Sequence, residues 1–300
     1  MSDPPAATLP SPVRRLARAG VHLASRLLRR RPGLRRHLQR LRFGNWATRW
    51  LAGHVIVTWR GVRVDVDPGE AHGFHVFVLG DYGGAELDAC VELCREARVF
   101  VDVGAHIGLF SLAVARACPA LHVVAIEADP DVAAWLTRNV ALNPDLESRI
   151  TLVEAAAAAE DGEVLFEASR GSDNVGTGHI ADEDAGARRP VTAIALGPWL
   201  VGRHLRPDVV KIDVEGGELG VLDGLWAAGE PADAMLLETH GHLFADADAF
   251  NLGVAQALTA RGYKLERLER GRWKPLADPA DLGGRAHVRA VRPTSGLGRD

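Results

Sequence analysis

Several residue types are scarce in this 300-residue chain, and each scarcity excludes a class of protein. Three cysteines are too few and too odd in number for a disulfide framework, which favours a reducing compartment and a cytoplasmic location. No apolar run reaches the roughly 18 residues that a membrane-spanning helix needs. Hydrophobic residues still make up 47% of the chain and charged residues 25%, so we expect a globular protein rather than a disordered or fibrous one.

Lysine is also scarce, and the basic residues are unevenly distributed. Only three lysines occur, and twelve of the 32 arginines lie within residues 1–50. With Asp3 as its one acid, that segment has a net charge of +11, whereas the remaining residues sum to −15. This predicts a basic, partly disordered and partly helical arm on an acidic body. Three interpretations stay open: a helix pair packed on the body or on a partner, an arm on an anionic membrane surface, and an arm that binds nucleic acid.

The rest of the chain divides into three predicted parts. Residues 51–97 are expected to form a hairpin and a helix that pack on the body, residues 98–292 an α/β domain, and residues 293–300 a flexible tail. In the long part, apolar strand runs alternate with helices, which is typical of a mostly parallel sheet with helices on both faces. Ligands bind such sheets at the carboxyl ends of the strands, so the residues after each strand are the site candidates.

The first candidate motif is VFVDVGAHIGLF, residues 99–110. Gly104 and Gly108 allow a ligand to approach the backbone closely, and the alternative is that they merely pack a helix tightly on a strand. Glu127 ends the next predicted strand, where a carboxylate commonly binds two ribose hydroxyls. Asp102 would repel a pyrophosphate but attract an amino-acid cation. The residues therefore favour S-adenosylmethionine over NAD as the cofactor.

Two later strand ends also carry ionisable side chains. In KIDVEGGELGVL (residues 211–222), Lys211 and Asp213 share one face of a buried strand, where pairing or substrate contact must offset the cost of burial. In LLETHGH (residues 236–242), His240 could act as a general base or be a satisfied surface histidine. Asp213, Glu215, Glu238 and His240 could hold a divalent ion, but we expect a site without metal.

Together, these segments resemble a known family. VFVDVGAHIGLFSL, VVAIEADP, DVVKIDVEGGELGVLDG and LLETHG have an order and spacing similar to the FkbM family of S-adenosylmethionine-dependent methyltransferases, over about residues 98–270. The resemblance implies a class I, Rossmann-like α/β fold with a seven-stranded, mostly parallel sheet and a reversed last hairpin. It also implies O-methylation (EC 2.1.1.-) of a hydroxyl on a sugar, glycolipid or polyketide-type natural product.

The resemblance further implies roles for individual residues. Those expected to bind the cofactor are Asp102, Gly104, Ala105, His106, Gly108, Glu127, Ala128, Asp129, Glu154, Ala155 and Asp213. Those expected around the acceptor, with Asp213 or His240 as the base, are Lys211, Asp213, Glu215, Glu238 and His240. The chain departs from the family at Ala195-Leu196-Gly197, where a Thr-Leu-Asp-like stretch is usual.

Two other function classes stay open. The basic arm would suit a nucleic-acid methyltransferase, but the acidic body is a poor track for phosphates and the fourth strand lacks an N/D-P-P-aromatic motif. The departure at Gly197 keeps open a non-catalytic scaffold with a degenerate methyltransferase fold.

Overall fold

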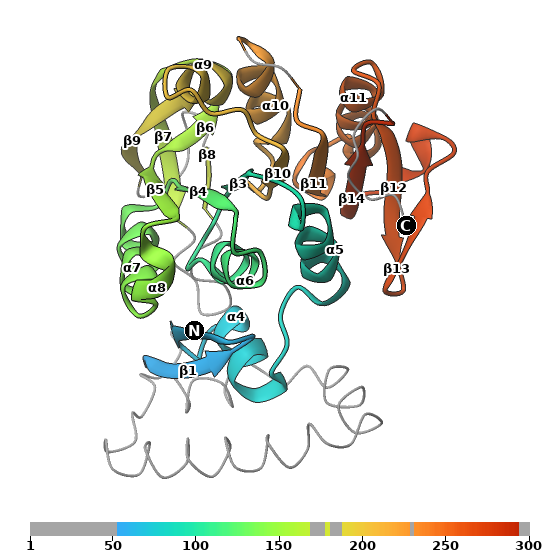
Figure 1. Ribbon diagram of the computed structural model, residues 1–300. Coiled ribbons are helices and arrows are strands. Elements are labelled where there is room, and N and C mark those ends of the chain that lie inside the picture. The colour runs from blue at the N-terminus through green and yellow to red at the C-terminus, as the bar shows by residue number, and fades with distance from the viewer. Residues whose placement is uncertain (1–52, 169–177, 181–187, 229–230, 294–300) are drawn as a thin grey trace, which may run out of the picture. The chain divides into compact units, whose positions relative to one another are not determined.

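The computed structural model describes residues 53–168, 178–180, 188–228 and 231–293 (Figure 1). The predicted basic arm and all but the first residue of the predicted tail lie outside the described residues, so both stay predictions. The chain divides into two compact units, with a boundary between Tyr82 and Gly83. This boundary lies inside the predicted part 51–97, so the hairpin and the helix of that part belong to different units.

The first unit contains a β-hairpin and two short helices. Its elements are β1 (Val55–Trp59), β2 (Val62–Val66), α4 (Ala71–Phe74) and the π-helix η1 (His75–Leu79). β1 pairs antiparallel with β2, as predicted. Arg60 and Gly61 both have positive φ, which a two-residue hairpin turn requires. Val62, Val64 and Val66 are fully buried, so one face of the hairpin contributes to a core.

The second unit is built on a mixed eight-stranded sheet with the order β13-β12-β14-β11-β10-β3-β4-β5. The strands are β3 (Val99–Val103), β4 (His122–Glu127), β5 (Ile150–Glu154), β10 (Val209–Ile212), β11 (Ala234–Thr239), β12 (Lys264–Glu269), β13 (Arg272–Pro275) and β14 (Ala286–Val291). The five strands from β5 to β11 are parallel, and β14 lies antiparallel between β11 and β12. The expected reversal at the end of the sheet is confirmed by the antiparallel pairing of β12 with β14. The sheet has one strand more than the expected seven, because β13 pairs with the edge of β12.

A smaller sheet with the order β6-β9-β7-β8 follows β5 in the chain. Its strands are β6 (Ala156–Ala158), β7 (Gly162–Ala168), β8 (Gly178–Ile180) and β9 (Arg188–Ala195). β7 and β9 pair antiparallel, and β6 joins β9 in parallel. This sheet therefore connects the end of β5 to the segment that leads into β10.

Helices cover both faces of the large sheet (Figure 1). The helical elements of this unit are α5 (Gly84–Cys94), α6 (Leu109–Ala117), α7 (Pro130–Ala141), α8 (Pro144–Glu147), α9 (Leu196–Val201), α10 (Glu218–Trp226), η2 (Gly241–Leu243), α11 (Ala247–Thr259) and η3 (Pro279–Leu282). One layer contains α5, α6, α7 and α8, and the other contains α9, α10 and α11. The predicted α/β architecture is confirmed.

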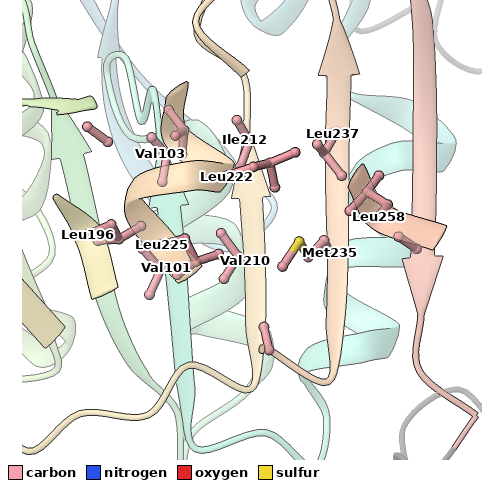
Figure 2. Close-up of a cluster of buried hydrophobic side chains, with 14 of the residues drawn as sticks. Val101, Val103, Leu196, Val210, Ile212, Leu222, Leu225, Met235, Leu237 and Leu258 are labelled. Atoms are coloured by element: carbon pink, nitrogen blue, oxygen red, sulfur yellow. The ribbon is translucent and has the colours of Figure 1, made fainter. Parts of the chain in front are cut away.

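The main core lies between the sheet and the layer formed by α9, α10 and α11 (Figure 2). Because side chains alternate along a strand, Val210 and Ile212 of β10 face this core together with Leu222 of α10. Val209 and Lys211 therefore point to the opposite face, where α5 contacts β10.

Among the described residues, no helix is long and apolar enough to cross a membrane.

The strand order changes direction at β3, because β4 lies on one side of it and β10 on the other. Open α/β sheets bind ligands outside the carboxyl ends of the strands at such a switch point. The candidate site is therefore the edge formed by the ends of β3, β4, β10 and β11.

Candidate functional site

The turn after β3 approaches the backbone at the end of β10 so closely that it requires glycine. Gly104 has φ +74°, and a Cβ atom placed there would lie 1.9 Å from the carbonyl oxygen of Asp213. Gly108 has φ +86°, and its Cβ atom would lie 2.3 Å from Cδ1 of Leu136. Gly104 therefore excludes a side chain for steric as well as conformational reasons, and Gly108 disfavours one because of its positive φ. The glycine-rich turn thus lies directly against the end of β10.

Glu127 joins this turn to the end of β4. Its Oε2 atom accepts a hydrogen bond from the backbone N–H of His106 at 2.8 Å, and Oε1 accepts one from Asp129 at 2.9 Å. The side chain is only 7% exposed. Burial raises the pKa of Glu127 to about 7, although the two backbone hydrogen bonds oppose that shift. The predicted cofactor residues Gly104, His106 and Glu127 therefore lie together.

Asp129 has a visible structural role. Its Oδ1 accepts a hydrogen bond from the N–H of Asp131 at 2.9 Å, which caps the N-terminus of α7. The same carboxylate forms an ion pair with Arg189 of β9. Asp129 therefore connects α7 to the small sheet, and its backbone N–H holds Glu127.

Asp102 lies beneath the turn, with no exposed surface. Its Oδ2 accepts a hydrogen bond from Oγ of Ser111 at 2.6 Å, and its Oδ1 is 3.6 Å from Nζ of Lys211. Burial raises its pKa, and the nearby Lys211 counteracts that effect. The structure thus brings Asp102 to Lys211 rather than to the surface of the site.

Lys211 links the two strand ends. Its Nζ is 3.2 Å from Oδ2 of Asp213 and lies 4.9 Å from the centre of the Phe110 ring. Its side chain is 4% exposed, so its charge is offset by Asp102 and Asp213 rather than by water. The pairing expected from the strand period is confirmed.

Three acids that follow β10, together with Glu238 of β11, converge on His240, which has no exposed surface. Its Nδ1 lies 2.6 Å from Oε1 of Glu218. Its Nε2 lies 3.5 Å from Oε2 of Glu215, 3.8 Å from Oε1 of Glu238 and 3.9 Å from Oδ1 of Asp213. We call these four carboxylates and His240 the acid–histidine cluster. It unites four of the five residues expected around the acceptor, and Lys211 contacts it through Asp213.

Two pKa shifts reflect this crowding. Burial lowers the pKa of His240, but the hydrogen bond to Glu218 and the charges of Glu215 and Asp213 outweigh burial and raise it overall. Burial raises the pKa of Glu215, whereas His240 lowers it. Glu215 also has φ +47°, an uncommon conformation for a residue with a side chain, and such strain is often found at functional sites.

Two members of the site were missed by the sequence analysis. Glu218 is the first residue of α10 and has no exposed surface. Arg285 forms an ion pair with Glu238, although 58% of its side chain is exposed. An acid in the first turn of a helix is a weak sequence signal for Glu218. No local pattern marks Arg285, because it lies 47 residues after Glu238 in the chain.

The remaining predicted cofactor residues are Ala105, Ala128, Glu154 and Ala155, and two of them make backbone hydrogen bonds near the site. The N–H of Ala105 donates to the carbonyl of Ile126, and that of Ala155 donates to the carbonyl of Glu127. Ala128 packs against the core of the small sheet. Glu154 is exposed and is the register partner of Glu127 on β5. Cofactor contact by these residues stays a prediction.

The departure at Gly197 has a packing reason. A Cβ atom at Gly197 would lie 2.3 Å from the carbonyl oxygen of Leu225. The close approach of α9 to α10 therefore leaves no room for an aspartate at this position.

Comparisons with known proteins agree with this architecture. The family model described as the methyltransferase FkbM domain matches residues 102–265, which is more than half of the chain. A curated relative, the hexuronic acid methyltransferase AglP of Haloferax volcanii, is 30% identical over 152 residues. The match covers 50% of this chain and 59% of that relative, so the chain spans about three-fifths of the relative's length.

Two solved structures are also similar. An S-adenosylmethionine-dependent methyltransferase from Agrobacterium tumefaciens has a TM-score of 0.47 and 14% identity, with 81% of this chain and 71% of that chain covered. An O-methyltransferase from Bacillus cereus, in complex with S-adenosylhomocysteine, has a TM-score of 0.44 and 13% identity, with 70% and 80% covered. On the family match and its own strand order, the chain belongs to the FkbM family of S-adenosylmethionine-dependent methyltransferases and has their class I fold.

Proposed function

We propose that this chain transfers a methyl group from S-adenosylmethionine to a hydroxyl of a sugar or a related hydroxylated acceptor. The contact between Gly104 and Asp213 is the main support. It brings the turn expected to bind the cofactor against the acid–histidine cluster. A ligand that lies along the turn would therefore have the carboxylates of the cluster as its neighbours.

The residues at the turn fit this cofactor. S-adenosylmethionine carries a sulfonium and an ammonium cation but no phosphate, and it supplies an electrophilic methyl group. Glu127 could accept hydrogen bonds from the ribose hydroxyls, because each carboxylate oxygen can accept more than the one backbone bond that it has. Asp213 and Glu215 would attract the cations of this cofactor and would repel a dinucleotide.

The protein's own task is then to position the acceptor and to remove its proton. We assign proton uptake to Asp213, because its backbone carbonyl lies against Gly104 of the glycine-rich turn and its side chain is 26% exposed. Lys211 holds its Oδ2 atom in place. His240 has no exposed surface, so it contributes through the carboxylates around it.

We propose sugar acids as the first acceptors to test. The relative from Haloferax volcanii is named for its action on a hexuronic acid. In this chain, the exposed guanidinium of Arg285 lies beside Glu238, where it could attract the carboxylate of such an acceptor.

The first experiment is calorimetric titration of the full-length chain with S-adenosylhomocysteine. We expect binding by the wild type, at least tenfold weaker binding by Glu127→Ala, and unchanged binding by Glu147→Ala, which alters an exposed glutamate on α8. Absence of binding by the folded wild type would contradict the proposed function. Equal binding by Glu127→Ala would contradict only the assignment of the ribose contact.

A further inference from the structure

The acid–histidine cluster contains a polar atom, Nε2 of His240, that has no role in proton uptake by Asp213. Nε2 of His240 is buried and has no hydrogen-bond partner among the residues that the structure describes. Buried polar atoms without a partner are rare, because they lose their hydration without compensation. This nitrogen is directed toward oxygens of Asp213, Glu215 and Glu238, at 3.5 to 3.9 Å.

Contrary to our expectation from the sequence, we propose that Asp213, Glu238 and His240 bind a divalent cation, of which Mn²⁺ is the best probe, and that this cation binds oxygens of the acceptor. The inference rests on the proposed function only for the identity of the acceptor. Asp213, Glu238 and His240 each offer one ligand atom, and these three atoms lie within 4.8 Å of one another.

The separations of these atoms suit a cation between them. Small divalent ions bind carboxylate and imidazole ligands at about 2.0–2.2 Å. Adjacent ligand atoms in an octahedral site are then about 3.0 Å apart and opposite ones about 4.2 Å. The distances of 3.8 and 3.9 Å from Nε2 of His240 lie between these two separations. Binding would therefore require the ligand atoms to move closer by up to about 0.9 Å.

Glu218 supplies the support that a metal-binding histidine needs. Metal-ligating histidines commonly donate their other ring N–H to a carboxylate, which fixes the tautomer and the ring orientation. Oε1 of Glu218 lies 2.6 Å from Nδ1 of His240 and could accept such a bond. With the single ring proton on Nδ1, as metal binding requires, the Nε2 lone pair would be directed toward Asp213 and Glu238. Glu218 also accepts a bond from the N–H of Gly216 at 3.2 Å, so it is held in turn.

The ligand set and the local charge indicate the type of ion and its role. Two carboxylates and one imidazole are a ligand set that suits Mn²⁺. Structural zinc sites, in contrast, are rich in thiolates. The carboxylates would repel an acceptor that carries its own carboxylate, such as a sugar acid. A bound cation would offset this repulsion, bind the hydroxyl and a neighbouring oxygen, and lower the pKa of that hydroxyl. With the cation bound, Asp213 would be its ligand, and Glu215 would be the carboxylate of the cluster that accepts the proton in place of Asp213.

One other group of side chains could compete for the ion. Glu86, Glu238 and His287 also offer three ligand atoms within 4.8 Å, and this triad shares Glu238 with the first. Its histidine is 34% exposed and already lies 3.2 Å from Glu86. We therefore favour the triad with His240, for which Glu218 supplies the supporting hydrogen bond.

The test is a titration of the metal-stripped, full-length protein with Mn²⁺, in which the electron paramagnetic resonance signal reports free ion. We expect one bound ion per chain and at least tenfold weaker binding by Asp213→Asn, Glu238→Gln and His240→Gln. Two matched controls, His242→Gln and Glu86→Gln, should bind Mn²⁺ like the wild type. A nitrogen coupling in the pulsed spectrum of the bound ion should be lost in His240→Gln. Circular dichroism verifies that each variant folds. If the variants of the buried ligands do not fold, Asp213→Asn still tests the site, because Asp213 is the most exposed of the three ligands.

The same samples are titrated with S-adenosylhomocysteine, which separates the two proposals. Absence of Mn²⁺ binding by protein that binds S-adenosylhomocysteine would overturn the metal site and leave the proposed function intact. Mn²⁺ binding that survives His240→Gln, or that is lost in Glu86→Gln, would also overturn it. Protein that binds Mn²⁺ as expected but not S-adenosylhomocysteine would support the metal site and contradict the proposed function.

Discussion

At the scale of single residues, Glu127 combines two properties with opposite effects on its pKa. It is almost fully buried, yet both of its oxygens accept backbone hydrogen bonds. The effect of burial exceeds that of the two hydrogen bonds, so the pKa of Glu127 rises from 4.5 to about 7. The carboxylate is therefore about half ionised near neutral pH, and only the ionised form can accept bonds from two hydroxyls with both oxygens.

Binding of S-adenosylhomocysteine should consequently depend on pH. With a pKa near 7, the ionised fraction rises about tenfold between pH 6 and pH 8, and we expect the affinity to rise by a similar factor. Calorimetric titrations at the two pH values measure this change. Glu127→Gln, which has no charge to lose, should bind equally at both. A wild type without pH dependence would show that the ribose contact does not need the charge.

The same shift has a consequence for the stability of the apo protein. Since the folded-state pKa of Glu127 exceeds the unfolded value, the folded chain binds more protons between pH 4.5 and about 7. This residue's contribution to the free energy of unfolding is thus largest at low pH and falls as the pH rises through that window. Glu127→Gln should lack that contribution.

At the scale of elements, α10 is packed through glycines on two sides. A Cβ atom at Gly224 would lie 1.9 Å from the carbonyl oxygen of Ala158 in β6, and one at Gly197 of α9 would lie 2.3 Å from that of Leu225. α10 also begins with Glu218, which holds His240. The position of the acid–histidine cluster therefore depends on how closely these elements pack.

Restoring the family-like acid by Gly197→Asp should consequently destabilise the protein. Overpacking costs about 1–3 kcal/mol, and a buried carboxylate without a partner adds to that cost. Gly202→Ala is the matched control, because Gly202 is exposed at the end of α9 and a Cβ atom there would have only ordinary contacts. Urea unfolding followed by circular dichroism measures both variants. If Gly197→Asp were as stable as the wild type, that result would contradict the close approach of α9 to α10 at this position.

At the scale of the whole molecule, the described part of the second unit supports its site from one continuous core. Leu222 has no exposed surface and lies among Val103, Ile212 and Leu237, which belong to three strands that end at the site (Figure 2). Because protein cores are close-packed, this shared core holds the strand ends in a fixed relation to one another.

Removing this packing should lower stability far more than it changes the chemistry of the site. We expect Leu222→Ala to lower the free energy of unfolding by about 2–5 kcal/mol. Val201→Ala, at a position that is 51% exposed, should change it little. Denaturant unfolding measures the difference, and S-adenosylhomocysteine titration of the folded Leu222→Ala variant should give nearly wild-type affinity. A cost below 1 kcal/mol would show that the core tolerates a cavity there.

Much of this organisation follows from the sequence by itself. The hairpin of β1 and β2, the alternation of strands and helices and the glycines after β3 are local patterns, because period, turn chemistry and steric demand depend on neighbours in the chain. The segments containing Asp102, Glu127, Asp213 and Glu238 also suffice to predict the family, which the family match confirms.

Only the tertiary structure decided how these residues meet. It pairs Asp102 with Lys211, brings Glu218 to His240, and sets Arg285 beside Glu238. It also closes position 197 to any side chain. These relations join residues that are distant in the chain, and they arise from the register of parallel strands and the close packing of α9 on α10. The sequence determined which groups are available, and packing decided which of them are neighbours.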